Sequence, residues 1–200
     1  MVRVFVELGP ARESSFAQPP SLLSECHRRI ERFLADMAGV VRSRKGGVLD
    51  DSDHSALAGA VQYFSVAAPR HTADEEESLF PRLRSAGAGA AVQAVEEIRR
   101  LEADHERADA CHAEANALAS RWLSEGTLPS AETNRLAELV ETLTAIYREH
   151  IAIEDSRVFP AAAAALPAKE LEAVGREMAA RRGLDFDRVV GQNPGFQRDP

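Results

Sequence analysis

Two eleven-residue segments of this chain, at 71–81 and 150–160, repeat one pattern. They agree at five positions, and in both the shared order is histidine, alanine, glutamate, phenylalanine and proline. A histidine also precedes each copy by a nearly equal interval, since His27 lies 44 residues before His71 and His105 lies 45 residues before His150. Such a repeat restricts the fold, because each copy must form the same supersecondary unit and the two units must pack together.

The unit is predicted to be a helical hairpin. Apolar residues recur every three or four positions, which is the period of an amphipathic α-helix. The pattern predicts helices over about 21–45, 50–84 and 90–125, a fourth from 130 through the second copy of the repeat, and a short fifth over 167–183. Ser21 and Ser130 are the expected N-caps, and Pro69 is expected to kink or split the second helix.

Four long amphipathic helices with short connections predict an all-α fold, namely an antiparallel up-down four-helix bundle with a short extra C-terminal helix. Two hundred residues suit one domain. We expect a strand-like segment and linker over 1–20, the bundle over 21–166, the short helix over 167–183 and a flexible tail over 184–200. The basic pair Arg181 and Arg182 is expected to be a solvated helix end.

Histidines and glutamates on the apolar stripes are the candidate functional residues. Residues four apart lie on one face of a helix, so both His-x-x-x-Glu pairs reach the same interior. Burying a carboxylate without a partner costs several kcal/mol, and no lysine or arginine lies on these stripes. A lone histidine on an apolar face is usually an ordinary core residue, but the duplicated pattern favours a bound metal. The predicted ligands are His27, His71, Glu75, His105, His150 and Glu154.

The donor types favour one kind of metal. Mixed imidazole and carboxylate donors with open positions suit iron or manganese, whereas structural zinc prefers closed sites that often contain thiolates. The two cysteines, Cys26 and Cys111, are predicted to be small core residues. Phe80 and Phe159 are also expected in the core.

The motifs resemble those of the hemerythrin-type domain, also called the HHE cation-binding domain, over about residues 21–166. The resemblance implies a four-helix bundle that holds two non-haem iron ions with an oxo or hydroxo bridge. It also implies that Glu75 and Glu154 bridge the metals, and that each iron takes the histidines of one hairpin. Members of this family carry or sense oxygen, handle iron, or respond to nitric oxide and peroxide.

The chain departs from the oxygen-carrying hemerythrins in two places. Those proteins have two histidines one turn apart on the third helix, whereas here Leu101 and Asp109 lie a turn either side of His105. They also have an aspartate five residues after the fourth helix's histidine. Asp155 occupies that position here, but Glu154 lies closer to the apolar stripe, and we favour it as the ligand.

Counting ligands leaves the coordination incomplete. Two six-coordinate irons with four histidines, two bridging carboxylates and one bridging oxygen retain two positions. These take small exogenous ligands or one further side chain. His112 lies two helical turns, about 10.5 Å, beyond His105 and is expected to be a core or supporting residue. The candidates for a seventh protein ligand are Glu102, Asp109, His54, His112 and Asp155.

The leading functional hypothesis is a di-iron protein that binds or senses O2 or a related small oxidant. Two alternatives remain open: an enzyme that acts on peroxide or nitric oxide, and an iron store or sensor without catalysis. The net charge of −8 argues against nucleic acid, and no apolar run is long enough to span a membrane. With two cysteines, a reducing cytoplasm is expected. The sequence leaves the oligomeric state open.

Overall fold

The structure is a computed structural model that describes residues 15–87 and 89–191, and within them the regular elements are all helical. The all-α prediction is therefore confirmed. The elements are α1 (Pro19–Arg44), α2 (Asp51–Ala73), η1 (Asp74–Leu79), α3 (Phe80–Ala86), α4 (Ala90–Glu125), α5 (Ser130–Ile153), η2 (Glu154–Val158), α6 (Phe159–Ala165), α7 (Ala168–Arg181) and α8 (Phe186–Gly191). The segments η1 and η2 are π-helical turns.

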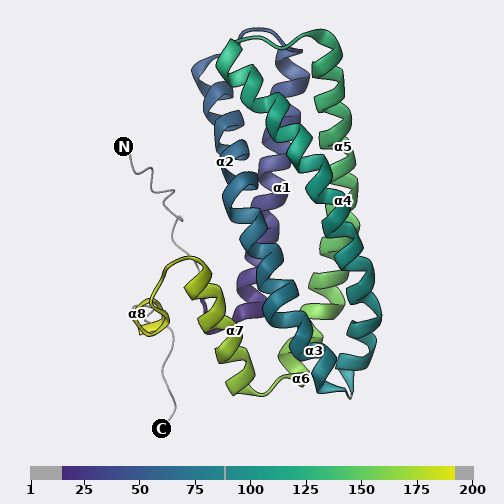
Figure 1. The fold of residues 1–200 in the computed structure, drawn as a ribbon, viewed down its shortest axis with the longest axis vertical. Coiled ribbons are helices and arrows are strands. Elements are labelled where there is room, and N and C mark those ends of the chain that lie inside the picture. Colours follow the sequence, from purple (N-terminus) through teal and green to yellow (C-terminus); the bar gives the residue numbers. More distant parts are fainter. Residues whose placement is uncertain (1–14, 88, 192–200) are drawn as a thin grey trace.

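Four long helices form the body of the molecule. Figure 1 shows α1, α2, α4 and α5 side by side along the long axis, with short loops joining α1 to α2 and α4 to α5 at one end. Each of α1 and α4 packs against both α2 and α5. Helix α2 continues through η1 into α3, and α5 continues through η2 into α6. The duplicated sequence pattern thus corresponds to two long helical hairpins, each with a π-helical turn in its second arm.

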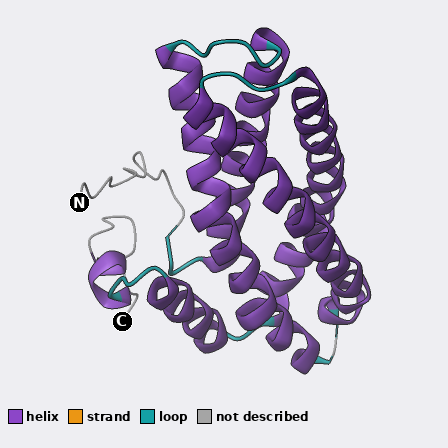
Figure 2. Cartoon of the chain, turned by 45° about the horizontal axis from the view of Figure 1, so that its top comes forward, coloured by secondary structure: helices purple, strands orange, loops and turns teal. Residues whose placement is uncertain are grey.

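Helices α7 and α8 lie outside this body. Figure 2 shows the C-terminal helices beside one end of the bundle, seen from a second direction. Helix α7 packs against η1 and α1. No helix in the described part of the chain is long and apolar enough to cross a membrane.

The apolar core consists of two clusters. One fills the end near the α1–α2 loop and includes Leu34, Leu57 and Trp122. The other fills the opposite end and includes Phe80 and Phe159, which are both buried as predicted. Between these clusters the interior contains polar side chains, and this polar layer holds the candidate site.

The loop after α1 depends on a glycine. Gly46 has φ +81°, and the Leu128 amide donates to its carbonyl over 2.8 Å. Beside it, the Trp122 indole donates to the Gly47 carbonyl over 2.9 Å. A Cβ at Gly46 would lie 2.2 Å from the Leu128 carbonyl oxygen and 2.4 Å from Thr133 Oγ1. The two loops at this end of the bundle therefore meet at a point where only glycine fits.

Replacing Gly46 by alanine is expected to lower the free energy of unfolding by about 2–4 kcal/mol. The left-handed conformation and the contact with the Leu128 backbone both oppose a side chain. Urea unfolding of the metal-free protein measures the change. The control is Gly39→Ala within α1, where no atom lies within 4 Å of the added Cβ. That change should stabilise the protein by about 0.5–1 kcal/mol, and equal effects of both substitutions would contradict the account.

The predicted N-caps are wrong. Helix α1 begins at Pro19 rather than after Ser21, because proline is well suited to the first helical turn, where its missing N–H leaves no bond unmade. Helix α5 has Pro129 at its N-cap position, and Ser130 is its first helical residue. The predicted strand-like segment lies mostly in residues 1–14, outside the described residues.

The expectation for Pro69 is also corrected in part, because α2 is not split there but continues to Ala73. The irregular backbone comes later, in η1. Proline is not its cause, since the second copy has Arg148 at the matching position and still forms a π-helical turn.

The predicted tail over 184–200 is wrong where the structure describes it. Residues 186–191 form α8, with Phe186 and Val190 buried. Phe186 packs against Ala179 of α7, and the Arg176 guanidinium lies 4.4 Å from the centre of its ring. These tertiary contacts give the segment an apolar face to bury, which its own sequence composition did not indicate.

Candidate metal centre

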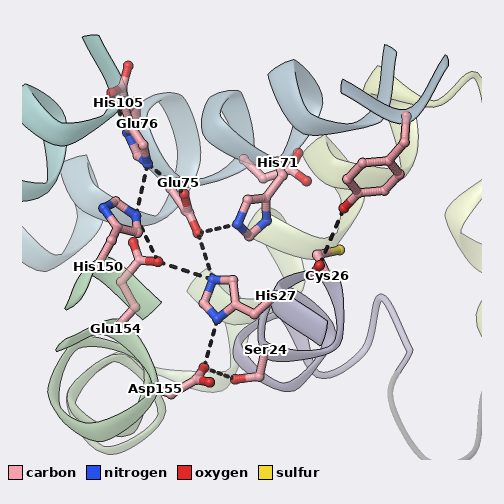
Figure 3. A network of polar contacts seen from close by, with 12 residues as sticks. Ser24, Cys26, His27, His71, Glu75, Glu76, His105, His150, Glu154 and Asp155 are labelled. Atoms are coloured by element: carbon pink, nitrogen blue, oxygen red, sulfur yellow. Dashed lines mark hydrogen bonds and ion pairs between the residues drawn. The ribbon is translucent and has the colours of Figure 1, made fainter. Parts of the chain in front are cut away.

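The six predicted ligands come together in the polar layer between the two apolar clusters (Figure 3). The histidines come one each from α1, α2, α4 and α5, and the glutamates come from the two π-helical turns. All six side chains are buried, with at most 4% of each residue exposed. They form two overlapping groups that share both glutamates: His27, His71, Glu75 and Glu154 in one, and Glu75, His105, His150 and Glu154 in the other.

Each glutamate contacts histidines of both groups. Oε1 of Glu75 lies 3.2 Å from His71 Nε2, and its Oε2 lies 3.4 Å from His105 Nε2. Oε2 of Glu154 lies 3.1 Å from His27 Nε2 and 3.1 Å from His150 Nε2. Both carboxylates therefore belong to both donor groups.

The spacing of the donors suits shared ions. Two donors about 2.1 Å from one ion and at right angles to each other are about 3 Å apart. The Nε2 atoms of His105 and His150 are 3.1 Å apart, and the contacts of the glutamates with the histidines fall near this value. The distances thus match donors that share a metal ion.

The unpaired polar atoms point to the same conclusion. Four carboxylate oxygens, those of Glu75 and Glu154, and Nε2 of His27 are buried without a hydrogen bond. Native proteins rarely leave such groups unsatisfied. Because these atoms belong to the two donor groups, bound metal cations would satisfy them, and the residues present fit a metal.

The pKa values of Glu75, Glu154 and His27 are all shifted in the metal-free site. Burial raises the pKa of Glu75 well above its ordinary value, and the neighbouring Glu154 adds to the shift. Burial would also raise the pKa of Glu154, but His150 and His27 hold it below its ordinary value. Burial lowers the pKa of His27, yet Asp155 and Glu154 outweigh it and raise that pKa to about 10. The anions here favour a positive charge that metal ions can supply.

A second layer of carboxylates orients two of the histidines. His27 Nδ1 donates to Asp155 over 3.0 Å, and His105 Nδ1 donates to Glu76 over 2.8 Å. Ser24 donates to the same Asp155 oxygen over 2.6 Å. When a metal binds, Nδ1 can keep its proton for the carboxylate while Nε2, which faces the centre, gives its lone pair to the ion.

This support crosses between the two hairpins. Asp155 belongs to the second repeat copy and supports His27 of the first, whereas Glu76 belongs to the first copy and supports His105 of the second. Each π-helical turn carries two consecutive carboxylates. The first one, Glu75 or Glu154, faces the donor groups, and the second one, Glu76 or Asp155, bonds a histidine of the other hairpin. Sequence reasoning considered Asp155 only as a possible ligand and missed Glu76, although an acidic residue directly after the ligand glutamate in both copies was an available signal.

Removing either supporting carboxylate is expected to weaken metal binding by about 10–100-fold. The variants are Asp155→Ala and Glu76→Ala, measured by metal titration of the full chain. Asp109→Ala is the matched control, because Asp109 is an exposed carboxylate on α4. Unchanged affinity in the first two variants, or an equal loss in the control, would contradict the supporting role.

None of the five candidates for a seventh ligand belongs to the two donor groups. Glu102 pairs with Arg84, with a contact of 2.7 Å, and Asp155 supports His27. Asp109 and His54 are exposed. His112 is buried and bonds Tyr147 instead, 3.0 Å from Nε2 to Oη. The six predicted donors are thus the residues that the fold gathers.

His112 is buried against the aromatic rings of Phe64 and Tyr147. The Phe64 ring stacks on it with 4.4 Å between the ring centres. Burial lowers the pKa of His112 to about 4, which favours the neutral imidazole at neutral pH, and its Nε2 shares a hydrogen bond with the Tyr147 hydroxyl. Its role is that of a buried core histidine.

Metal-free protein is expected to lose stability through His112 as the pH falls from about 6.5 to about 4. The folded pKa is below the ordinary value of 6.5, so the unfolded chain binds the proton more readily in this range. The stability is present above pH 6.5 and is lost progressively below it, by about 3 kcal/mol at most. His112→Gln, which still accepts a hydrogen bond, should show a smaller loss between pH 7 and 4.5 in urea unfolding. An identical loss in both proteins would refute this assignment.

The prediction that Arg181 and Arg182 are solvated is wrong. Both guanidinium groups pair with Asp74, which is fully buried. Sequence reasoning missed this pair because the partners are 107 and 108 positions apart.

Comparison with known proteins agrees with the fold and the site. The hemerythrin HHE cation binding domain matches residues 18–162, so the chain belongs to this family. The chain is also similar to an uncharacterized protein of Haemophilus influenzae, with 29% identity over 180 residues that cover 88% of this chain and 96% of that protein. The fold, the family and the buried clusters of histidine and glutamate together define a metal-binding helical bundle.

Proposed function

We propose that this chain holds two non-haem iron ions at the six donors and binds or senses O2 or a related small oxidant there. The observation that carries the proposal is the sharing of Glu75 and Glu154 between the two donor groups. A single ion would need one group only. Two groups that share two carboxylates suit a pair of ions instead.

The donor set favours iron. Four imidazoles and two carboxylates without a thiolate suit iron or manganese, and the set leaves open positions. Cys26 follows the first turn of α1 but belongs to neither donor group. Bound iron would supply reversible electron transfer and an affinity for O2, nitric oxide and peroxide.

The residues around the proposed centre determine which molecules can reach it. In the proposal α1, α2, α4 and α5 form an antiparallel four-helix bundle in which each helix supplies one histidine. The apolar clusters on both sides exclude water and bulky molecules from the polar layer. Small uncharged ligands pass through such packing more readily than substrates of ordinary size. This selectivity favours a diatomic or similarly small oxidant.

The test is the reaction of the iron-loaded protein with small oxidants. After anaerobic loading with ferrous iron, exposure to O2 should change the visible absorption spectrum, and removal of O2 should reverse the change. His150→Ala should lose the response. Continuous consumption of peroxide or nitric oxide, faster than with free iron, would assign an enzyme instead. Iron binding without any response to oxidants would assign a store.

A further inference from the structure

We propose that α7 is a positioning element of the metal centre, in which Arg181 and Arg182 hold Asp74 and thereby fix the π-helical turn that carries Glu75. The proposal rests on the proposed metal binding. Helix α7 begins at Ala168, beyond the residues 18–162 that match the family. The inference therefore assigns a function to a part of the chain outside the family domain.

The first observation is the pairing of Asp74, which is fully buried. Arg181 Nη1 donates to its Oδ1 over 2.9 Å, and Arg182 Nη2 donates to its Oδ2 over 2.6 Å. Both carboxylate oxygens are thus used, each by a separate arginine. Charge-assisted bonds of this kind are short and directional, so they fix the position of the Asp74 backbone relative to α7.

The second observation is the extent of the contact. Arg181 Nη2 also donates to Glu77 over 3.0 Å and to the Ser78 hydroxyl over 2.8 Å. Both residues belong to η1, as does Asp74. Arg181, the last residue of α7, and Arg182, its C-cap, therefore contact η1 before and after Glu75 and Glu76.

The geometry of the π-helical turn explains why this contact matters. A π-helical turn contains one residue more than the α-helical path it replaces. A return to regular α-helix would rotate the following side chains by about 100° around the helix axis. Glu75 and the buried residues after the turn, such as Phe80, could then not both keep their present positions. Contacts that hold η1 in its present form consequently hold the ligand in place.

The two repeat copies differ in residue type at the position of Asp74. The residue that matches Asp74 in the second copy is Ile153, which packs against the apolar cluster at that end of the bundle. There, apolar packing holds the turn. In the first copy a carboxylate takes the place of the isoleucine, and a buried carboxylate is stable only with its partners. The turn η1 therefore depends on α7, and η2 does not.

The packing of α7 supports a fixed attachment. Val174 and Met178 are fully buried. Gly175 lies so close to the chain before α1 that an added Cβ would be 1.9 Å from the Phe16 carbonyl oxygen. Arg82 of α3 pairs with Glu177 over 2.7 Å. Helix α7 is thus fixed by apolar packing, a close backbone contact and an ion pair, and these contacts also fix the position of Arg181 and Arg182.

The experiment uses the full chain with Arg181→Gln and Arg182→Gln combined, and Co²⁺ as the probe. We expect at least a tenfold loss of Co²⁺ affinity together with an altered cobalt absorption spectrum. Arg176→Gln is the matched control, because Arg176 lies on the same helix and pairs with the exposed Glu172. Arg181→Lys combined with Arg182→Lys should retain part of the affinity that the glutamine variant loses. Unchanged affinity and spectrum in the double glutamine variant would overturn the proposal.

A second measurement does not depend on metal binding. In metal-free protein, hydrogen exchange at the amides of residues 74–79 should be faster in the double variant, and exchange at 154–158 should stay unchanged. Equal exchange of 74–79 in the variant and the wild type would overturn the positioning role. Should the double variant fail to fold, Arg182→Gln alone takes its place in both measurements. Failure of the wild type to bind any metal would instead contradict the proposed function.

Discussion

Removal of the bound metals is expected to lower the melting temperature by about 20 °C. The metals bind the folded chain, because the six donors converge only there. At a free metal concentration a thousand times the dissociation constant, each site adds about 4 kcal/mol. Two sites add about 8 kcal/mol, and for a chain of this size 1 kcal/mol corresponds to about 2–4 °C. Calorimetry before and after chelation measures the shift.

Each of the two proposed ions should account for about half of the change in melting temperature on chelation. His71→Ala removes a donor from one group only, and His105→Ala removes one from the other. Each variant should retain roughly half of the shift on chelation. Equal melting temperatures with and without metal in the wild type would contradict a metal site coupled to folding.

Glutamine substitutions at the two glutamates are expected to have opposite effects on the metal-free protein and the same effect on metal binding. At pH 8, Glu75→Gln should raise the free energy of unfolding by about 1–3 kcal/mol, because it removes a buried carboxylate that burial disfavours. Glu154→Gln should lower it by about 3–5 kcal/mol, because Glu154 is the anion beside His27 and His150. Both should weaken metal binding by about 100-fold.

The signs follow from the pKa shifts. The folded pKa of Glu75 is raised above its ordinary value of 4.5, so its contribution is present below that pH and is lost as the pH rises through the folded pKa. Glutamine resembles the protonated acid and avoids this loss. The folded pKa of Glu154 is lowered, so its contribution is present above pH 4.5 and is lost as the pH falls through the folded pKa.

Urea unfolding of chelated protein at pH 8, with metal titration of the same samples, measures both effects. The pair of variants controls itself, since the chemical change is the same in both. Destabilisation of equal size by the two substitutions would show that the glutamates are equivalent in the metal-free site. Full metal binding by either variant would remove that glutamate from the ligand set.

The sequence predicted the elements that depend on local spacing. A histidine and a glutamate four residues apart share a helix face, and the repeat of His71 and Glu75 by His150 and Glu154 relates the two hairpins. The structure brings these residues together with His27 and His105, as expected from their places on the apolar stripes. The long helices and their connections follow from the same periodicity.

The features that the sequence did not predict depend on tertiary contacts or on small changes of backbone form. A π-helical turn differs from an α-helix by one inserted residue, and the pattern of apolar residues does not reveal it. The bond from His27 to Asp155 joins positions 128 residues apart. The pairing of Arg181 and Arg182 with the buried Asp74, and the packing of Phe186, likewise require the folded neighbours.

The cross-support between the hairpins has a consequence for assembly of the site. Because Asp155 orients His27 and Glu76 orients His105, neither hairpin alone presents a complete half-site. Metal affinity therefore depends on correct packing of both hairpins. This dependence explains why the metals are expected to contribute so much to the stability of the fold.

Iron stoichiometry tests the central claim most directly. Purified full-length chain is loaded with ferrous iron under anaerobic conditions, freed of excess metal and analysed for iron and protein. Two ions held between His27, His71, Glu75, His105, His150 and Glu154 predict two irons per chain, falling to one or fewer in Glu154→Gln. Less than one iron per chain in the wild type, or an iron content that Glu154→Gln leaves unchanged, would contradict the account.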